Sequence, residues 1–224
     1  MKLLHADITT ISLLLANLVT IFSAVIQHWS LLVILWTYWC QSVIIGVFNF
    51  FRILNLKDFS AKGFTINRRA AKLTEQTKVF TAIFFAIHYM GFHMGYASFL
   101  SLYTLGIISP TFGVLTHTSS MPRESLSGLV FVPFLAMVFF VNHLISYKFY
   151  KDKPKKKQNI GTIMFYPYAR ILPMHATIVF GSFATIFFGG FFGGSSQALL
   201  FFFLLLKTAA DVIMHSIEHR QQWQ

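Results

Sequence analysis

Long apolar runs, separated by short polar segments, make up most of this chain. A helix needs about 20 apolar residues to cross the hydrocarbon core of a bilayer, and six runs have about this length. They cover residues 9–27, 31–51, 79–105, 126–147, 171–190 and 197–215. Since apolar and polar positions do not alternate within them, helices are favoured over barrel strands. The pattern predicts an all-α fold: a polytopic membrane bundle of six transmembrane helices in a single domain over residues 1–224.

Composition agrees with this interpretation. Hydrophobic residues make up 55% of the 224 residues and charged residues only 11%, whereas soluble domains have about a quarter of their residues charged. We therefore expect a multi-pass protein integral to the cell (plasma) membrane. The only cysteine, Cys40, excludes an intramolecular disulfide and a cysteine-based zinc site.

The lysines and arginines predict the orientation. Seven lie in residues 52–78 and seven more in residues 148–170. Because cationic loops stay on the cytoplasmic side, we expect both segments to be cytoplasmic loops and both chain termini to be cytoplasmic. Within the first loop, residues 56–78 fit either a short amphipathic helix on the inner surface or a solvated connector.

The formal net charge of +11 indicates which partners to expect. The basic residues flank the predicted spans, so they indicate anionic lipid headgroups at the cytoplasmic loops. No nucleic-acid-binding motif accompanies them, and we expect no nucleic acid as a partner. The lipid bilayer is the expected partner, and a homodimer is left open.

Histidines from three predicted helices fall at one depth. His143, His175 and His215 each lie five residues from a cytoplasmic cation that marks a span boundary, or about 7 Å into the membrane. Asp211 and His88 follow at about 13 and 15 Å. Ionisable groups inside a bilayer are costly and usually mark function. We therefore predict a site among the last four helices, opening to the cytoplasm.

The last predicted helix carries the densest candidate chemistry. Asp211, His215 and His219 follow each other at four-residue steps and so share one helix face. Two histidines at this spacing can bind one metal ion, and the carboxylate can complete or orient the set. Lys207 stands one turn before Asp211, and the two can neutralise each other. A structural ion pair with two interfacial histidines is the alternative.

Other polar residues are expected to line the interior or to join helices. His88 and His93 are five residues apart, about 140° around a helix, so both cannot easily ligate one ion. Gln41 and Asn49 fit hydrogen bonds between helices. The full lining set is Lys207, Gln41, Asn49, Arg170 and His93, where Arg170 could meet a lipid phosphate or an anionic substrate group.

Four stretches together resemble a family of small prokaryotic polytopic membrane proteins without an established activity. They are "YWCQSVIIGVFNFFRI", "HYMGFHMGY", "YARILPMHATIVFG" and "KTAADVIMHSIEH". This resemblance covers most of the membrane part and implies a shared helical fold.

The chain is also similar, more weakly, to membrane hydrolases of the alkaline ceramidase and progestin-adipoQ receptor kind. Those proteins hold zinc with three histidines near the cytoplasmic face, helped by an Asp and a Ser. Their last-helix H-x-x-x-H matches His215 and His219, which the resemblance implies are ligands. The chain departs in having six predicted spans rather than seven, and no serine is matched.

The leading hypothesis is a membrane metal-binding protein, with zinc-dependent hydrolysis of a lipid-like substrate from the cytoplasmic side as its activity. His143, His175 and His215 would bind Zn²⁺, with His219 as a further ligand. Asp211 would be a ligand or general base, and His88 would assist catalysis. Another transition metal would suit the same groups.

Three alternatives remain. A proton- or metal-coupled transporter would use Lys207, Asp211, His88 and His215 as a relay. A bis-histidine haem protein would pair His88 with His143 or His175. A non-catalytic scaffold would use the same residues as a buried polar network.

Overall fold

A computed structural model describes residues 30–105, 128–151, 157–188, 200, 202–210 and 212–213. Its helices are α2 (Leu31–Leu54), α3 (Glu75–Thr104), α5 (Val132–Lys151) and α6 (Ile160–Phe188), with a 3-10 turn, η1 (Gly128–Phe131), leading into α5. Residues 202–210 are helical as well. The predicted helical fold is thus confirmed for this part of the chain, while the first predicted span, residues 9–27, lies outside it.

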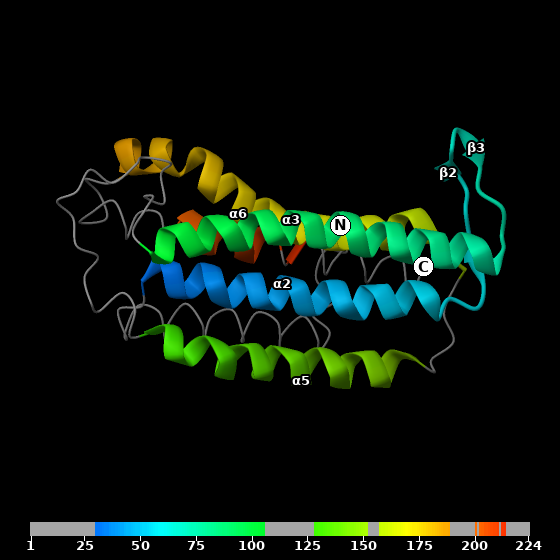
Figure 1. The fold of residues 1–224 in the computed structure, drawn as a ribbon, viewed down its shortest axis with the longest axis horizontal. Helices are drawn as coiled ribbons and strands as arrows, with labels where there is room; N and C mark the ends of the chain where they lie inside the picture. Colours follow the sequence, from blue (N-terminus) through cyan, green and yellow to red (C-terminus); the bar gives the residue numbers. More distant parts are fainter. Residues whose placement is uncertain are drawn as a thin grey trace, which may run out of the picture.

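Helix α2 lies at the centre of the described bundle. Helices α3 and α6 pack on one side of it and α5 on the other (Figure 1). Five successive residues at the start of α2, Leu31 to Leu35, are at most 4% exposed. The start of α2 is therefore covered on all sides, as expected of an apolar helix in an interior, and the helix contacts α3, α5 and α6.

Side chains that cap the first turn determine where three helices begin. Ser30 Oγ accepts a hydrogen bond from Val33 N at the start of α2, and Thr74 Oγ1 accepts one from Thr77 N at the start of α3. Asn159 Oδ1 accepts from Thr162 N at the start of α6. Such caps satisfy backbone N–H groups that have no partner within the helix.

Helix α6 corrects the predicted second basic loop. The loop was expected to run from residue 148 to 170, but α5 extends to Lys151 and α6 already begins at Ile160. The Asn159 cap and the apolar residues after it favour this earlier start. Pro167 and Pro173 lie inside α6, where each removes one backbone donor. Arg170, expected at the membrane edge, is therefore a residue of the helix interior.

Short strands, not an amphipathic helix, order the basic segments. Strand β1 (Phe59–Ser60) pairs in parallel with β4 (Gln158–Asn159), and β2 (Thr65–Ile66) pairs antiparallel with β3 (Arg69–Ala70). Asn159 Nδ2 also donates to Lys62 O at 2.8 Å. Of the two alternatives for residues 56–78, the connector agrees with these strands, and an amphipathic helix does not form before α3 begins at Glu75. The two basic segments are tied together at the end of the bundle where α2 ends and α3 and α6 begin.

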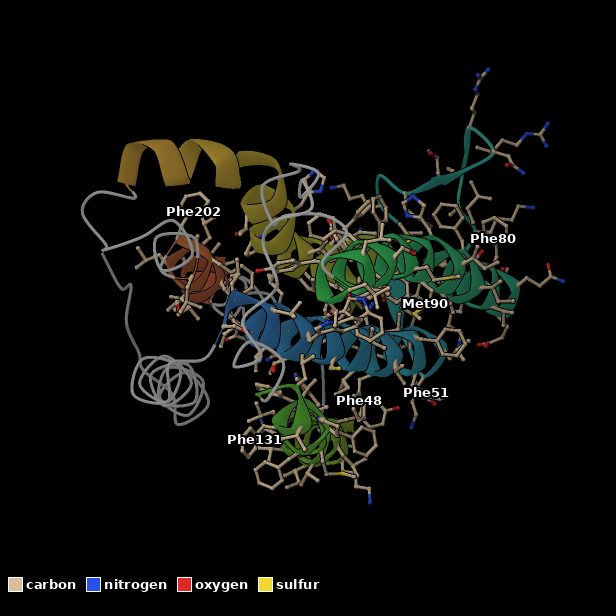
Figure 2. The ribbon with its side chains drawn as sticks, turned by 60° about the vertical axis from the view of Figure 1, so that its left-hand side comes forward. Phe48, Phe51, Phe80, Met90, Phe131 and Phe202 are labelled. Carbon is tan, nitrogen blue, oxygen red and sulfur yellow. The ribbon has the colours of Figure 1, made fainter. Side chains whose placement is uncertain are left out.

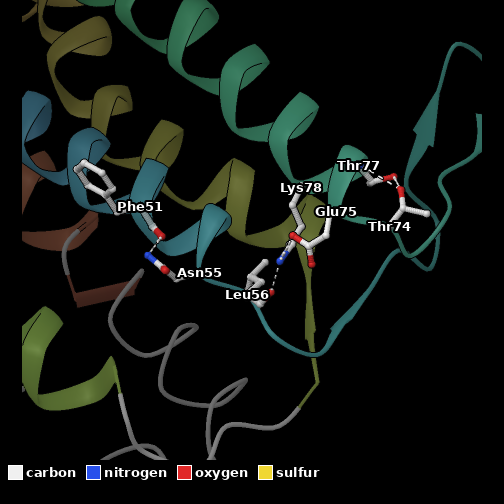
Figure 3. Close-up of polar contacts among 7 residues, drawn as sticks. All are labelled: Phe51, Asn55, Leu56, Thr74, Glu75, Thr77 and Lys78. Atoms are coloured by element: carbon white, nitrogen blue, oxygen red, sulfur yellow. Dashed lines mark hydrogen bonds and ion pairs between the residues drawn. The ribbon is translucent and has the colours of Figure 1, made fainter.

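A buried lysine reinforces this basic end. Lys78 is 6% exposed; its Nζ donates to Leu56 O at 2.8 Å and lies 2.7 Å from the carboxylate of Glu75 (Figure 3). The ammonium therefore has partners despite its burial, as a buried charge requires. At the end of α2, Asn55 Nδ2 donates both to Phe51 O and to Tyr147 Oη of α5.

The outer surfaces of the helices are strongly apolar. Large apolar side chains lie exposed along α3 and α5, for example Ile87 (72% exposed), Met94 (69%), Phe134 (67%) and Ile145 (62%). Figure 2 shows Phe80 of α3 and Phe131 of η1 on the outside of the bundle. Such a surface is unfavourable in contact with water, and monomeric soluble proteins rarely expose large contiguous apolar patches.

Two helical segments within the described residues are long and apolar enough to cross a membrane. They are Leu31–Leu54 and Gly128–Lys148. This finding supports membrane association by length and composition. The predicted number of six spans and the predicted orientation of the termini remain predictions.

Candidate functional site

Two tyrosine–histidine pairs join α3 to α6. His88 Nδ1 and Tyr168 Oη are 2.8 Å apart, and Tyr96 Oη and His175 Nδ1 are 2.9 Å apart. Helix α3 supplies the histidine of the first pair and the tyrosine of the second, and α6 supplies the reverse. From the first pair to the second, the residue number rises by eight along α3 and by seven along α6, which is about two turns in each helix. The two helices therefore run parallel here. His93 lies between His88 and Tyr96 on α3.

His93 is the most deeply buried histidine of the described residues, with no exposed surface. Its Nδ1 lies 2.9 Å from the carbonyl oxygen of Tyr89, and since a carbonyl can only accept, Nδ1 carries the proton. In neutral His93 the other ring nitrogen, Nε2, is therefore unprotonated and has a lone pair that can accept a hydrogen bond. It has no hydrogen-bond partner among the described residues. Metal-ligating histidines are commonly held in this way, with the second nitrogen bonded to a carbonyl.

The surroundings of His93 are aromatic and tightly fixed. Trp39 Nε1 donates to His93 O at 2.9 Å, and the rings of Tyr89 and His93 have centroids 4.3 Å apart. Tyr89 Oη in turn donates to Ser42 O at 3.0 Å and lies 2.8 Å from Ser42 Oγ. These contacts join α3 to α2 and leave the His93 ring little freedom to turn.

Gly46 makes room for Tyr89. A Cβ atom at position 46 would lie 2.8 Å from Tyr89 Cδ1 and closer still to Cε1. The tyrosine ring therefore packs directly on the backbone of α2. Only glycine permits this approach, and the position of Tyr89, which orients His93, depends on it.

Asn49 confirms the expected hydrogen bond between helices. Its Nδ2 donates to Ile163 O of α6 at 3.1 Å, and the side chain is buried. Pro167 explains why this carbonyl needs an outside donor: proline has no N–H, so Ile163 O lacks its partner four residues on. Gln41, the other residue predicted for such a role, is also buried.

Lys207 lies against α2. It is 6% exposed, and its Nζ stands 4.1 Å from the centre of the Tyr38 ring. The ring of Phe203, one turn earlier, is 5.3 Å from the same tyrosine. The predicted location of Lys207 inside the bundle agrees with this burial. Its predicted partner Asp211 lies outside the described residues, so that ion pair stays a prediction.

His143 and His175 are not brought together. The His143 ring lies 6.2 Å from Phe48, on α5, whereas His175 lies on α6 on the opposite side of α2 (Figure 1). Their distances along the helices from the basic end of the bundle differ too. His175 lies fifteen residues after the start of α6, about 22 Å, and His143 lies eight residues before the end of α5, about 12 Å. The predicted common layer took Arg170 as the boundary of a span. Arg170 lies within α6, ten residues after its start, so it does not mark the start of that helix.

The remaining predicted site residues stay untested. His215, His219 and Asp211 lie outside the described residues, as does the side chain of Arg170. Among the residues with described positions, no three histidine, cysteine or acidic side chains are grouped so that they could hold a metal ion. His88 is exposed and bonded to Tyr168, and the proposed haem pairs of His88 with His143 or His175 stay predictions as well.

The sequence interpretation missed the tyrosines. Tyr89, Tyr96 and Tyr168 hold His93, His175 and His88 in place. A signal was present, because Tyr89 and Tyr96 are seven residues apart in "HYMGFHMGY" and flank His93 on one face of the helix.

Comparison with known proteins identifies one family. Residues 2–224 match a family described as a family of unknown function, DUF6498. No curated protein and no solved structure matches the chain.

Proposed function

Since the chain belongs to the DUF6498 family, whose function is unknown, we propose its function from its own residues. We propose a multi-pass protein of the cell membrane, with six spans and with both termini on the cytoplasmic side. The exposed apolar surfaces of α3 and α5 support insertion in lipid. The basic segments at one end of the bundle support a cytoplasmic location for that end.

Within this membrane bundle we propose a transition-metal site, with zinc as the expected ion. The observation that carries the proposal is the buried Nε2 of His93, which has no hydrogen-bond partner among the described residues and whose ring is oriented by the bond from Nδ1 to Tyr89 O. Leaving such an acceptor empty in an apolar interior costs about 1–3 kcal/mol. A bound cation would use this lone pair and offset that cost.

The last helix is the expected source of the other ligands. Lys207 contacts Tyr38, and the neighbouring residue Trp39 donates to His93 O. Lys207 and His93 therefore lie at the same level of α2. Asp211 follows Lys207 by one turn in the sequence, and His215 and His219 follow by two and three turns. Asp211 and His215 are the first candidates to join His93, and His219 would be nearer the cytoplasm.

The proposed activity is hydrolysis of a lipid-like ester or amide, which adds water across the bond and releases an acid with an alcohol or amine. A bound zinc ion would lower the pKa of its water to about 7. In this chain His93 would hold the ion and Asp211 would accept the proton of the water. The aromatic surroundings of His93 would exclude bulk water and admit an apolar substrate.

Metal content of the purified protein tests the proposal. We expect about one zinc or similar ion per chain by elemental analysis after metal-free washing. His93→Asn should lose the ion, because the asparagine amide can still donate to Tyr89 O but has no atom at the Nε2 position. His88→Asn is the matched control and should keep it, because His88 lies on the exposed side of α3 and bonds Tyr168. Metal-free wild-type protein, or equal metal in both variants, would contradict the site.

A proton-coupled transporter is the second candidate. The two tyrosine–histidine pairs along α3 and α6 and the buried Lys207 support it, since such groups relay protons in membrane proteins. Metal-free protein whose reconstituted vesicles show a proton flux sensitive to Lys207→Met would favour this function over the hydrolase.

A further inference from the structure

The β2–β3 hairpin stands apart from the helices at the basic end of the bundle. Thr65 pairs with Ala70 and Ile66 with Arg69, and Figure 1 shows the hairpin rising across the direction of α2 and α3. Residues 67–70, which include its turn, are all exposed. The hairpin therefore contributes little to the core of the bundle.

The turn of this hairpin holds an arginine in a conformation that favours glycine. Asn67 and Arg68 have φ values of 50° and 61°, as a two-residue hairpin turn with positive φ at both positions requires. Asparagine tolerates this region well, but at the second position glycine is preferred because a Cβ atom is crowded. Arg68 is thus unfavourable for the turn itself. A strained side chain at an exposed tip indicates a role in binding.

The charge around the turn indicates the chemistry of the ligand. Residues 55–74 carry five cationic side chains, all exposed, and one acidic side chain, Asp58. The cations are Lys57, Lys62, Arg68, Arg69 and Lys72. Arginine presents a planar fork of donors that matches phosphate oxygens. Two adjacent arginines at the tip suit a phosphate-bearing ligand.

The position of the hairpin selects lipid headgroups as the source of that phosphate. If α2 and α5 cross the membrane, as proposed above, a hairpin lying across their direction runs along the membrane plane. It leaves the bundle at the end where the headgroups of the cytoplasmic leaflet would lie. Leu73, 56% exposed and next to Lys72, would place an apolar side chain at the same surface. We infer that the β2–β3 hairpin is an arm that binds anionic phospholipid headgroups through Arg68 and Arg69.

A spin label on the hairpin tests this inference, which depends on the proposed membrane insertion. The label is placed at Ala70→Cys in a Cys40→Ser background, in the full chain reconstituted in nanodiscs. In phosphatidylcholine alone we expect a mobile label that a water-soluble nickel chelate reaches. When phosphatidylglycerol is included, a second, immobilised component should appear, and high salt should remove it.

The variant Arg68→Gly separates binding from folding. Glycine suits the turn, so the hairpin should be at least as well formed, yet the guanidinium is gone. The equilibrium constant between immobilised and mobile label should fall about fivefold, the usual contribution of one cation near an anionic surface. Lys57→Gln is the matched control: it removes one charge at the same end of the bundle, outside the hairpin, and should leave the constant unchanged.

Three outcomes would overturn the inference. The label could be equally mobile in both lipids, or Arg68→Gly could be immobilised as strongly as the parent. Immobilisation in phosphatidylcholine discs on adding inorganic phosphate would assign the arm to a soluble phosphate ligand instead of lipid. Failure of the proposed insertion would look different, because the chain would then not be incorporated in nanodiscs of either composition.

Discussion

The contact between Gly46 and Tyr89 shows how one missing side chain can position a buried histidine. A Cβ atom at position 46 would push away the Tyr89 ring, which lies against the His93 ring with centroids 4.3 Å apart. We expect Gly46→Ala to lower the free energy of unfolding by about 1–3 kcal/mol, as overpacked interiors do. Thermal unfolding in detergent, followed by tryptophan fluorescence, would measure the loss.

Gly91 and Gly95 of α3 provide the matched controls for this substitution. A Cβ atom at either position would meet no atom within 4 Å. Alanine there should be neutral or stabilising by up to about 1 kcal/mol, because glycine is a poor helix former. If Gly46→Ala were as harmless as these two changes, the close packing of Tyr89 on α2 would be refuted.

At the same scale, the candidate residues were easier to predict than their partners. The burial of Lys207 and the bond of Asn49 to another helix follow from the cost of polar groups in an apolar segment. The tyrosine partners do not, because a tyrosine in such a segment also fits an aromatic belt. The residue that a histidine contacts on a neighbouring helix depends on how each helix is rotated about its own axis. The sequence pattern does not specify this rotation.

At the scale of elements, α6 depends on a donor from α2. Asn49 replaces the N–H that Pro167 lacks, so Asn49→Leu should leave Ile163 O without a partner. We expect a loss of about 1–3 kcal/mol in the free energy of unfolding. Equilibrium unfolding in mixed detergent and denaturant would give this value.

Restoring the missing donor should make Asn49 dispensable. In Pro167→Ala the helix can bond its own carbonyl, so adding Asn49→Leu should cost less than it does in the parent chain. A double-mutant cycle measures this coupling, which we expect to be about 0.5–3 kcal/mol. Purely additive effects would show that the two residues do not act on the same carbonyl.

The start of α6 marks the limit of prediction from the basic residues. The basic residues predict a loop from residue 148 to residue 170, but α5 continues to Lys151 and α6 begins at Ile160, ten residues before Arg170. The apolar stretch between Ile160 and Tyr166, together with a capping Asn159, indicated an earlier start. Arg170 therefore does not mark the start of this helix, although a cation beside an apolar run commonly marks the boundary of a span.

At the scale of the molecule, the basic end should face the cytoplasm. We expect a membrane-impermeant maleimide to label Ala70→Cys or Lys157→Cys, each in the Cys40→Ser background, in inside-out vesicles and not in right-side-out vesicles. Both positions lie at the same end of the bundle, and Lys157, like Ala70, is exposed. Gly95→Cys serves as a control for a position within the proposed membrane region and should react slowly from either side. Labelling of the two basic positions from the outside would reverse the proposed orientation.

The pairing of β1 with β4 has a consequence for how the helices can move. It joins the connection between α2 and α3 to the residues that start α6, and the bond from Lys78 to Leu56 O closes the same end. Helices held together there can separate only at their other ends, so the bundle would open about a fixed hinge at its basic end. A molecule entering between the helices would then arrive sideways from the bilayer or from the far side, and the basic end would serve as the pivot.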